Sequence, residues 1–231
     1  MSTINLSVRI ISEIFWKIIF TEDELITSSI KTKLFDDLIN LEKLRGQADY
    51  NTGSIGLTQA YSLYLFLKYF KPEKIIEVGT FIGRSTLSMA NAVDTYSDIG
   101  EIHTCDMSNN ILLPWKGKTI IKQYPNTKSL EMLKKLNGEF DLIFLDGRIS
   151  NEELGLLENL ISQKTIIILD DFEGMEKGVI NLTKLRKLQK LNNHFQINPP
   201  TEEFLKSYQF KTHSLMAALV PFSLFRFTNQ G

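Results

Sequence analysis

The chain has 231 residues, of which 43% are hydrophobic and 23% charged, a composition typical of one well-packed globular domain. Its 26 Lys and Arg against 27 Asp and Glu give a net charge of −1, which argues against a nucleic acid partner because phosphate backbones require a broad positive face. Cys105 is the single cysteine, which excludes an intrachain disulfide and a cysteine-based zinc cluster. A reducing cytoplasm is therefore the expected compartment.

Residues 1–56 are expected to form a helical extension of the same domain, either a lid or an oligomer contact. Apolar residues within Val8–Phe20 recur at the spacing i, i+3, i+4, which predicts an amphipathic helix. Glu13 and Lys17 interrupt the apolar run, which is also shorter than the ~20 residues of a membrane span. Packing of this helix on the domain, or on a second copy in a homodimer, is favoured over attachment to a membrane surface.

Residues 57–231 are expected to form the ligand-binding domain, in which short apolar runs alternate with helical segments. Such runs predict parallel strands that are buried on both faces. Two apolar stretches within Thr212–Thr228, separated at Pro221, predict a C-terminal antiparallel hairpin. The fold class is therefore α/β, a doubly wound, Rossmann-like and mostly parallel sheet. The predicted strands are Ile75–Val78, Ile102–Cys105, Thr119–Lys122, Phe140–Leu145 and Thr165–Leu169, and the predicted helices after the first are Ser28–Leu44, Leu57–Phe70, Ser85–Asp94, Lys128–Asn137, Asn151–Ile161 and Glu176–Leu191.

The segment IIEVGTFIGRSTLSM, residues 75–89, joins a predicted strand to a predicted helix through Gly79 and Gly83. Such a glycine turn lets a nucleotide-like ligand approach the backbone closely. Glu77 places a negative charge before the turn, where a phosphate-binding loop avoids one, and this favours a ligand that carries positive charge. Phe81 replaces the middle glycine of the dinucleotide fingerprint and the Lys-Ser/Thr pair of a P-loop is missing, so NAD and ATP are disfavoured.

Aspartates end the other predicted strands. Asp106 closes the second strand, where an acid can accept hydrogen bonds from both ribose hydroxyls; a simple turn cap is the competing interpretation. Asp146 and the pair Asp170 and Asp171 end two later strands. Because ligands of such sheets bind beyond the carboxyl ends of the strands, these four carboxylates and the glycine turn are expected to converge on one rim.

The run EVGTFIGRS, Glu77–Ser85, resembles the E-[IVL]-G-[TA]-[YF]-x-G-x-S motif of class I S-adenosylmethionine-dependent methyltransferases. It is most similar to their metal-dependent O-methyltransferase branch, of which catechol O-methyltransferase is typical, and the resemblance extends from about Ser54 to Asp171. It implies S-adenosylmethionine as the cofactor. The implied contacts are Glu77 and Ser85 at the methionine end, Gly79 along its path, Asp106 at the ribose, Met107 on the adenine, Ile55 near the methionine carboxylate and Asn126 with Thr127 at the adenine edge, together with Thr80, Phe81, Gly83 and Asp146.

The same resemblance implies a divalent cation, Mg²⁺ or another, held by Asp146, Asp170 and Asp171, with Asp171 where the family has Asn. Hard cations prefer carboxylate oxygens, and a bound cation would lower the pKa of a substrate hydroxyl. The competing interpretation is that these strand-end aspartates cap the helices that follow.

Two positions depart from the family pattern. Ile149 stands where catechol-type enzymes carry Lys, and Arg148 stands where related enzymes often carry His. Because an arginine does not lose its proton in proteins, Arg148 cannot be the general base. It is expected either to bind an anionic group of the substrate or to form a surface ion pair with an acid such as Glu152. The proton acceptor is left unassigned.

The sequence therefore predicts methyl transfer from S-adenosylmethionine to an oxygen of a small molecule, assisted by a divalent metal, with Asp146, Asp170 and Arg148 as the catalytic residues. Two alternatives stay open. One is a metal-independent O- or N-methyltransferase of a sugar or natural product, in which Asp170 or Asp171 acts as the base. The other is a non-catalytic nucleoside-binding module with the same fold.

Overall fold

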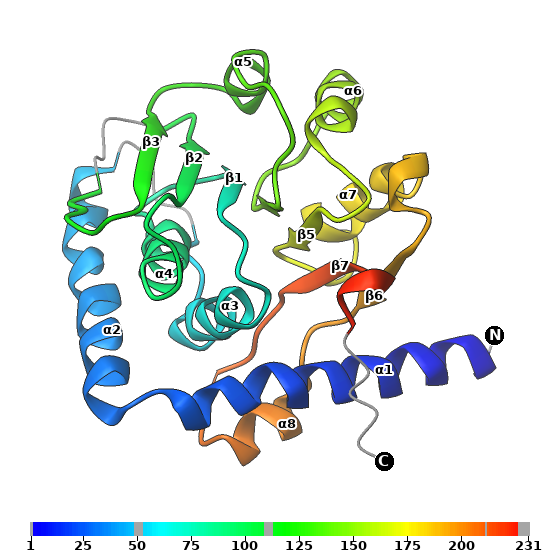
Figure 1. The fold of residues 1–231 in the computed structure, drawn as a ribbon, viewed down its shortest axis with the longest axis horizontal. Coiled ribbons are helices and arrows are strands. Elements are labelled where there is room, and N and C mark those ends of the chain that lie inside the picture. The colour runs from blue at the N-terminus through cyan, green and yellow to red at the C-terminus, as the bar shows by residue number, and fades with distance from the viewer. Residues whose placement is uncertain (1, 49–52, 109–112, 211, 226–231) are drawn as a thin grey trace.

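A computed structural model describes residues 2–48, 53–108, 113–210 and 212–225, with side chains from residue 8 onward. Within these residues the chain forms a sheet of seven strands in the order β3-β2-β1-β4-β5-β7-β6 (Figure 1). The strands are β1 (Lys74–Val78), β2 (Glu101–Cys105), β3 (Ile120–Tyr124), β4 (Leu142–Leu145), β5 (Ile166–Leu169), β6 (His194–Ile197) and β7 (Ala217–Pro221). The first five are parallel, and β7 runs antiparallel to both of its neighbours. The expected doubly wound, mostly parallel sheet is confirmed.

Helices cover both faces of this sheet (Figure 1). They are α1 (Ser2–Thr21), α2 (Ser28–Asn40), α3 (Leu57–Phe70), α4 (Arg84–Val93), α5 (Ser129–Leu133), α6 (Asn151–Leu160), α7 (Lys177–Leu185) and α8 (Glu202–Ser207), with 3₁₀ turns at Glu22–Leu25, Leu41–Gln47, Gln189–Leu191 and Phe222–Leu224. The helices α3 and α4 lie on one face with α1, whereas α5, α6 and α7 lie on the other. Each face therefore has its own hydrophobic core.

Alternate strand residues supply the two cores. Ile75 of β1 packs with the core around α3 and α4, whereas the next residue, Ile76, packs with the core under α5, α6 and α7. The same alternation holds in β5, where Ile166 and Ile167 face opposite sides. Because successive side chains of a strand point to opposite faces, a strand covered on both faces is apolar at every position. This requirement explains the uninterrupted apolar runs in the sequence.

The helix α1 packs its aromatic face on the domain. Phe15, Trp16 and Phe20 are buried in the core that also contains α3, and the Trp16 indole N–H donates to the carbonyl of Asn198 at 2.7 Å. The predicted amphipathic helix is thus present and covers one end of the sheet (Figure 1). None of the helices in the described part of the chain is both long enough and apolar enough to cross a membrane.

A C-terminal antiparallel hairpin is confirmed, but its strands are β6 and β7, so only β7 lies within the predicted Thr212–Thr228. Pro221 ends β7 and is followed by a 3₁₀ turn, while residues 226–228 of the predicted hairpin lie outside the described residues. The single helix predicted over Glu176–Leu191 is divided into α7 and a 3₁₀ turn, because Leu188 between them adopts an extended conformation. The strand β6 and the helix α8 were not predicted.

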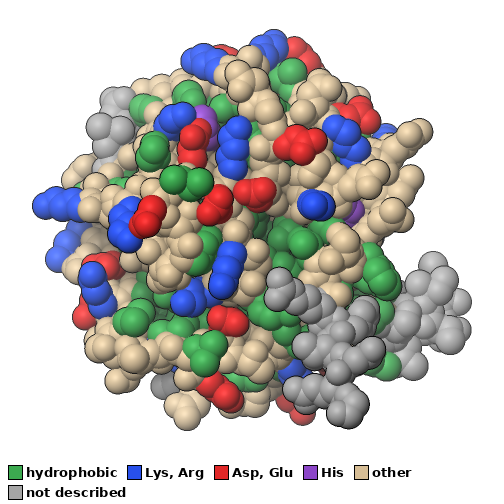
Figure 2. Space-filling view, viewed as in Figure 1, with side chains coloured by type: hydrophobic (Ala, Val, Ile, Leu, Met, Phe, Trp, Pro, Cys, Tyr) green, Lys and Arg blue, Asp and Glu red, His purple; other side chains and the backbone are tan. Residues whose placement is uncertain are grey.

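Charged side chains of both signs are interspersed on the face shown in Figure 2, and among the described residues of that face neither sign forms a broad patch. This distribution agrees with the net charge of −1.

Candidate functional site

The turn between β1 and α4 has the backbone that its glycines predict. Gly79 has φ +101° and Gly83 has φ +82°, both in the region that favours glycine. A Cβ added at Gly79 would lie 3.2 Å from both the Cβ and the carbonyl oxygen of Asp146, and one added at Gly83 would lie 2.7 Å from Cδ1 of Leu113. The N–H of Gly79 donates to the carbonyl of Cys105 at 3.0 Å. The turn therefore passes close to the ends of both neighbouring strands, β2 and β4.

Asp106, which follows β2, connects this turn to the next loop. Its Oδ2 accepts the N–H of Phe81 at 2.6 Å, and its Oδ1 accepts the N–H and the hydroxyl of Ser108 at 2.8 and 2.6 Å. Phe81 itself has φ +44°. The carboxylate is thus fixed at the end of β2 by donors from both loops.

A cavity of about 190 Å³ lies between these loops, beyond the carboxyl ends of β1, β2 and β4, where open α/β sheets bind their ligands. Six of the predicted site residues line it: Gly79, Phe81, Asp106, Met107, Asp146 and Arg148. Thr127, from the predicted adenine-edge loop, also lines it, and six further lining residues were not predicted: Gly53, Val78, Cys105, Ser129, Gly147 and Lys177. The predicted convergence of the glycine turn with Asp106 and Asp146 is therefore present in the structure.

Glu77 lies behind the turn and does not line the cavity. Its side chain is fully buried, Oε2 accepts the hydroxyl of Thr86 at 2.5 Å, and Oε1 has no hydrogen-bond partner within the described residues. Burial raises the pKa of Glu77 to about 7, although the nearby hydroxyls of Ser85, Thr104 and Thr86 oppose this rise. A buried acceptor without a partner is suited to pair with a cationic group.

The other predicted cofactor residues surround the cavity without lining it. The carbonyl of Ile55 accepts from the guanidinium of Arg84 at 3.3 Å. The Thr80 hydroxyl forms a hydrogen bond with the hydroxyl of Thr104. Asn126 has φ +50°, and the next residue, Thr127, lines the cavity instead. Of the two residues expected in the adenine-edge loop, Thr127 thus lines the cavity and Asn126 does not.

The three predicted metal ligands form one acidic group, here called the acidic triad: Asp146, Asp170 and Asp171. Leu145 and Leu169, the last residues of β4 and β5, are paired in register, so Asp146 and Asp170 follow neighbouring strand ends. One oxygen of each triad member lies within 4.8 Å of an oxygen of the others. Burial raises the pKa of Asp146, and the charge of Asp170 adds to this rise. Burial also raises the pKa of Asp170.

Lys177, the first residue of α7, supplies the positive charge beside the triad. Its Nζ lies 2.5 Å from Oδ1 of Asp146 and 3.0 Å from Oδ2 of Asp171. Burial disfavours the ammonium, but the charges of these two carboxylates outweigh this effect and raise the pKa of Lys177. Sequence reasoning missed this residue, because a lysine at the start of a predicted helix carries no signal of such a contact.

Arg148 is exposed at the cavity mouth, while its neighbour Ile149 is buried in the core. Glu152, the acid predicted as an alternative partner of Arg148, instead pairs with Lys134 at 2.8 Å. The ion pair between Arg148 and Glu152 was therefore wrongly predicted, because the Glu152 carboxylate pairs with a lysine at the end of α5.

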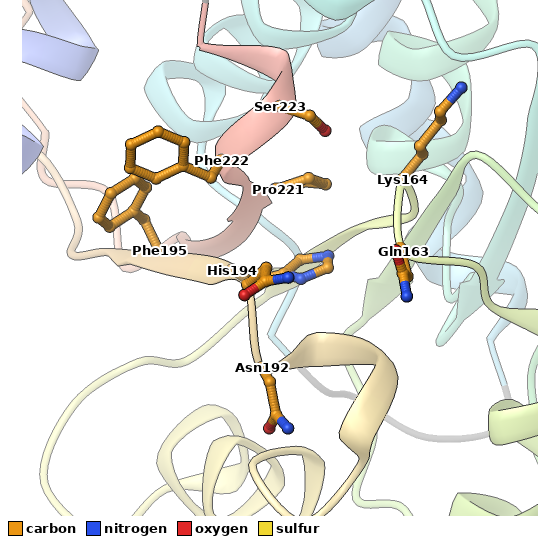
Figure 3. A pocket seen from close by; sticks show the side chains of 9 residues that line it. Gln163, Lys164, Asn192, His194, Phe195, Pro221, Phe222 and Ser223 are labelled. Carbon is orange, nitrogen blue, oxygen red and sulfur yellow. The ribbon is translucent and has the colours of Figure 1, made fainter.

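A larger cavity of about 660 Å³ lies at the amino end of β5, away from the acidic triad (Figure 3). His194 lines it and forms a hydrogen bond from Nε2 to the carbonyl of Thr165, and the rings of Phe195 and Phe222 lie beside each other at its edge (Figure 3). None of the predicted site residues lines this cavity.

A comparison with known proteins matches the part of the chain that supplies most of the lining of the cavity at the carboxyl ends of the strands. Residues 76–172 match the model of a family described as a methyltransferase domain. This part of the chain is therefore similar to a methyltransferase domain. The matched segment begins in β1 and ends just after Asp171, so it contains the glycine turn, Asp106 and the acidic triad.

A curated protein to which this chain is similar is the O-methyltransferase hkm8 of Aspergillus hancockii. It is 33% identical over 111 residues, which are 44% of this chain and 43% of the relative, so the match spans less than half of the relative's length.

Solved structures share the fold over more of the chain. The O-methyltransferase TomG of Streptomyces achromogenes, in complex with SAM, has a TM-score of 0.55 at 15% identity and covers 80% of this chain and 89% of its own. An O-methyltransferase of Bacillus cereus, in complex with SAH, has a TM-score of 0.53 at 16% identity and covers 80% of this chain and 90% of its own. At such identities the likeness shows the fold, and the doubly wound, Rossmann-like fold predicted from the sequence is confirmed.

Proposed function

We propose that this protein transfers a methyl group from S-adenosylmethionine to an oxygen of a small molecule. The observation that carries the proposal is the convergence of Gly79, Asp106 and Asp146 on one cavity at the carboxyl ends of the strands, within the segment that is similar to a methyltransferase domain. O-methyltransferases of the same fold have been solved with SAM or SAH, which supports the choice of cofactor.

The described contacts support a proposed role for three of the predicted cofactor residues. Gly79 lets the turn pass close to Asp146, where a Cβ would lie 3.2 Å from the Asp146 carbonyl oxygen, and so brings the turn to the edge of the cavity. Asp106 is held by the N–H groups of Phe81 and Ser108 at the end of β2, where an acid can accept hydrogen bonds from ribose hydroxyls. Glu77 has an unpartnered oxygen that would accept from the ammonium of the methionine moiety. Together these groups recognise a nucleoside with a cationic end.

The bound cofactor supplies an electrophilic methyl group, and the protein must orient an acceptor oxygen in line with it. The acceptor oxygen must lose its proton as it attacks. Asp146 and Asp170 lie at this rim with raised pKa values, which makes a carboxylate here a better proton acceptor than an ordinary surface aspartate.

The metal-assisted form of the proposal rests on the donor set of the acidic triad. Three carboxylates with oxygens within 4.8 Å of one another have the hard oxygen chemistry that Mg²⁺ prefers. A divalent ion would be held by Asp146, Asp170 and Asp171 and would polarise the acceptor oxygen.

The metal-independent form is favoured by one specific observation. Lys177 already places an ammonium on Asp146 and Asp171, two of the three candidate ligands.

Arg148 is proposed to bind an anionic group of the substrate, since its guanidinium is exposed at the cavity mouth. Replacing Arg148 by Gln should raise KM for the acceptor while the affinity for S-adenosylhomocysteine stays unchanged. The matched control is Arg9→Gln on α1, far along the chain and paired with Glu13. Equal kinetics of the Arg148 variant and wild type would remove this role.

The roles of residues 1–56, the homodimer and the cytoplasmic compartment stay predictions from the sequence. Support for a contact between copies comes from Ile10 and Ile14 of α1, which are 48% and 54% exposed although they belong to the predicted apolar stripe.

Calorimetric titration tests the cofactor assignment. S-adenosylhomocysteine should bind to the wild type, whereas NAD and ATP should not. Asp106→Ala should weaken this binding about ten- to hundredfold, because hydrogen bonds to a charged group contribute about 1.5–3 kcal/mol. Asp98→Ala, at an exposed aspartate paired with Lys118, is the matched control and should leave the affinity unchanged. Absence of S-adenosylhomocysteine binding to the wild type would refute the proposal.

A screen of hydroxyl-bearing small molecules separates an enzyme from a non-catalytic nucleoside-binding module. Methylated product formed with S-adenosylmethionine is the expected result. Cofactor binding without product from any acceptor class would favour the binding module.

A further inference from the structure

The acidic triad needs a positive charge because of where the sheet places it. Asp146 and Asp170 follow strand ends that are paired in register, and both side chains are largely buried. Three carboxylates that approach within 4.8 Å repel one another, and burial strengthens this repulsion by excluding water. A fold that brings these groups together must neutralise them by protons, by a bound cation or by a basic side chain.

The structure shows which neutralising groups reach the triad. Asp170 accepts a hydrogen bond from the side-chain amide of Gln59, at the start of α3. Asp146 and Asp171 share the ammonium of Lys177, whose side chain is only 25% exposed. Each member of the triad thus has a partner supplied by the chain itself.

A lysine at the first position of a helix is electrostatically unfavourable unless nearby acidic groups stabilise its charge. The N-terminus of a helix carries a partial positive charge, which disfavours a cation there. Lys177 is the first residue of α7, and the helix follows the triad directly in the chain. Its two carboxylate partners offset the unfavourable helix dipole, so the position of Lys177 is explained by the triad rather than by the helix.

Gly178 fixes how closely α7 approaches the triad. A Cβ at this position would lie 2.3 Å from the carbonyl oxygen of Asp170 and 3.0 Å from that of Asp171. Only glycine lets the first turn of α7 rest directly on the end of β5. This contact brings the neighbouring Lys177 within reach of Asp146, which follows β4.

We propose that the ammonium of Lys177 is the resident cation of the acidic triad, taking the place that a divalent ion would occupy on Asp146 and Asp171. Lys177 and a divalent ion compete for the same oxygens. The wild-type protein therefore has little affinity for Mg²⁺ or Mn²⁺, and removal of the Lys177 ammonium creates a divalent site. The bearing of this inference on methyl transfer rests on the proposed function, whereas cation binding by the triad does not.

Electron paramagnetic resonance of free Mn²⁺ measures the competition directly. Lys177→Met should bind Mn²⁺ at least roughly tenfold more tightly than the wild type, since a tenfold change corresponds to about 1.4 kcal/mol and close charge pairs couple by more than this. Adding Asp170→Asn to Lys177→Met should abolish the gain. Lys187→Met, at an exposed lysine just after α7, should behave as the wild type.

Thermal unfolding gives a second measurement that does not depend on activity. Lys177→Met should lower Tm in EDTA, and millimolar MgCl₂ should restore it, whereas Tm of the wild type and of Lys177→Arg should not respond to MgCl₂. Tight Mn²⁺ binding by the wild type would overturn the inference. So would a Lys177→Met variant that binds Mn²⁺ no better than the wild type.

S-adenosylhomocysteine binding, measured on the same samples, separates this inference from the proposed function. If the cofactor product fails to bind while Lys177→Met gains Mn²⁺, the proposed function is wrong and the resident cation stands. If the cofactor product binds while the wild type also takes up Mn²⁺ tightly, the resident cation is wrong and the cofactor assignment stands.

Discussion

Glu77 should give the free protein a characteristic pH dependence of stability. Its pKa is raised from an ordinary 4.5 to about 7, because the side chain is fully buried behind the glycine turn. The folded protein therefore keeps this proton between about pH 4.5 and pH 7, whereas the unfolded chain has released it. Where the folded state binds more protons, the free energy of unfolding falls as pH rises.

The magnitude follows from the size of the shift. A shift of about 2.5 pH units at about 1.36 kcal/mol per unit corresponds to about 3 kcal/mol. This contribution is fully present below pH 4.5 and is lost once pH exceeds about 7. Glu77→Gln cannot ionise, and its amide oxygen can still accept the hydroxyl of Thr86. The variant should therefore gain about 3 kcal/mol relative to the wild type as pH rises through this window.

Urea unfolding of both proteins at a series of pH values measures this difference. Other titrating groups contribute similarly to both proteins, so the difference in unfolding free energy isolates Glu77. A difference that stays flat from pH 4.5 to 7.5, or that changes in the opposite direction, would refute the reasoning.

Four further substitutions test the packing and capping of the fold. Gly83→Ala should cost about 1–2 kcal/mol, because φ is +82° and the added Cβ meets Leu113, whereas Gly155→Ala inside α6, with open space around it, should stabilise by about 0.5–1 kcal/mol in the same urea assay. Trp16→Ala should lower the unfolding free energy by about 3–5 kcal/mol, since the side chain is fully buried; a loss below 1 kcal/mol would mean that α1 does not pack as described. Ser150→Ala removes the N-cap of α6 and should cost about 1 kcal/mol in calorimetric or urea unfolding, and an unchanged stability would show that the cap contributes nothing.

The central strands were predictable because burial on both faces leaves a strong signal. Ile166–Leu169 is apolar at every position, and so is Leu142–Leu145. The strand His194–Ile197 was missed because it pairs with β7 alone, at the edge of the sheet, so its sequence HFQI mixes polar and apolar residues. Apolar patterns therefore predict the central strands, which are buried on both faces, but they do not predict a strand at the edge of the sheet, where polar residues are tolerated.

The candidate site likewise contains some residues that the sequence predicts and others that it does not. Asp106 and Asp146 were predictable because a residue that ends a parallel strand must lie at the ligand-binding rim. Lys177 was not predictable, since its place beside the triad depends on how closely Gly178 lets α7 approach β5. Glu77 was assigned to the cofactor by the motif, but whether its side chain lines the cavity depends on the path of the turn.

The position of β7 has a consequence for how the polypeptide folds as it is synthesised. This strand lies between β5 and β6 although both precede it in the chain, and all five of its residues are buried. Until residues 217–221 leave the ribosome, the apolar edge of β5 stays unpaired and β6 has no partner. Unpaired apolar edges recruit other chains. Nascent chains that stall before residue 217 should therefore aggregate or depend on chaperones, even though they already contain every residue that lines the cofactor cavity.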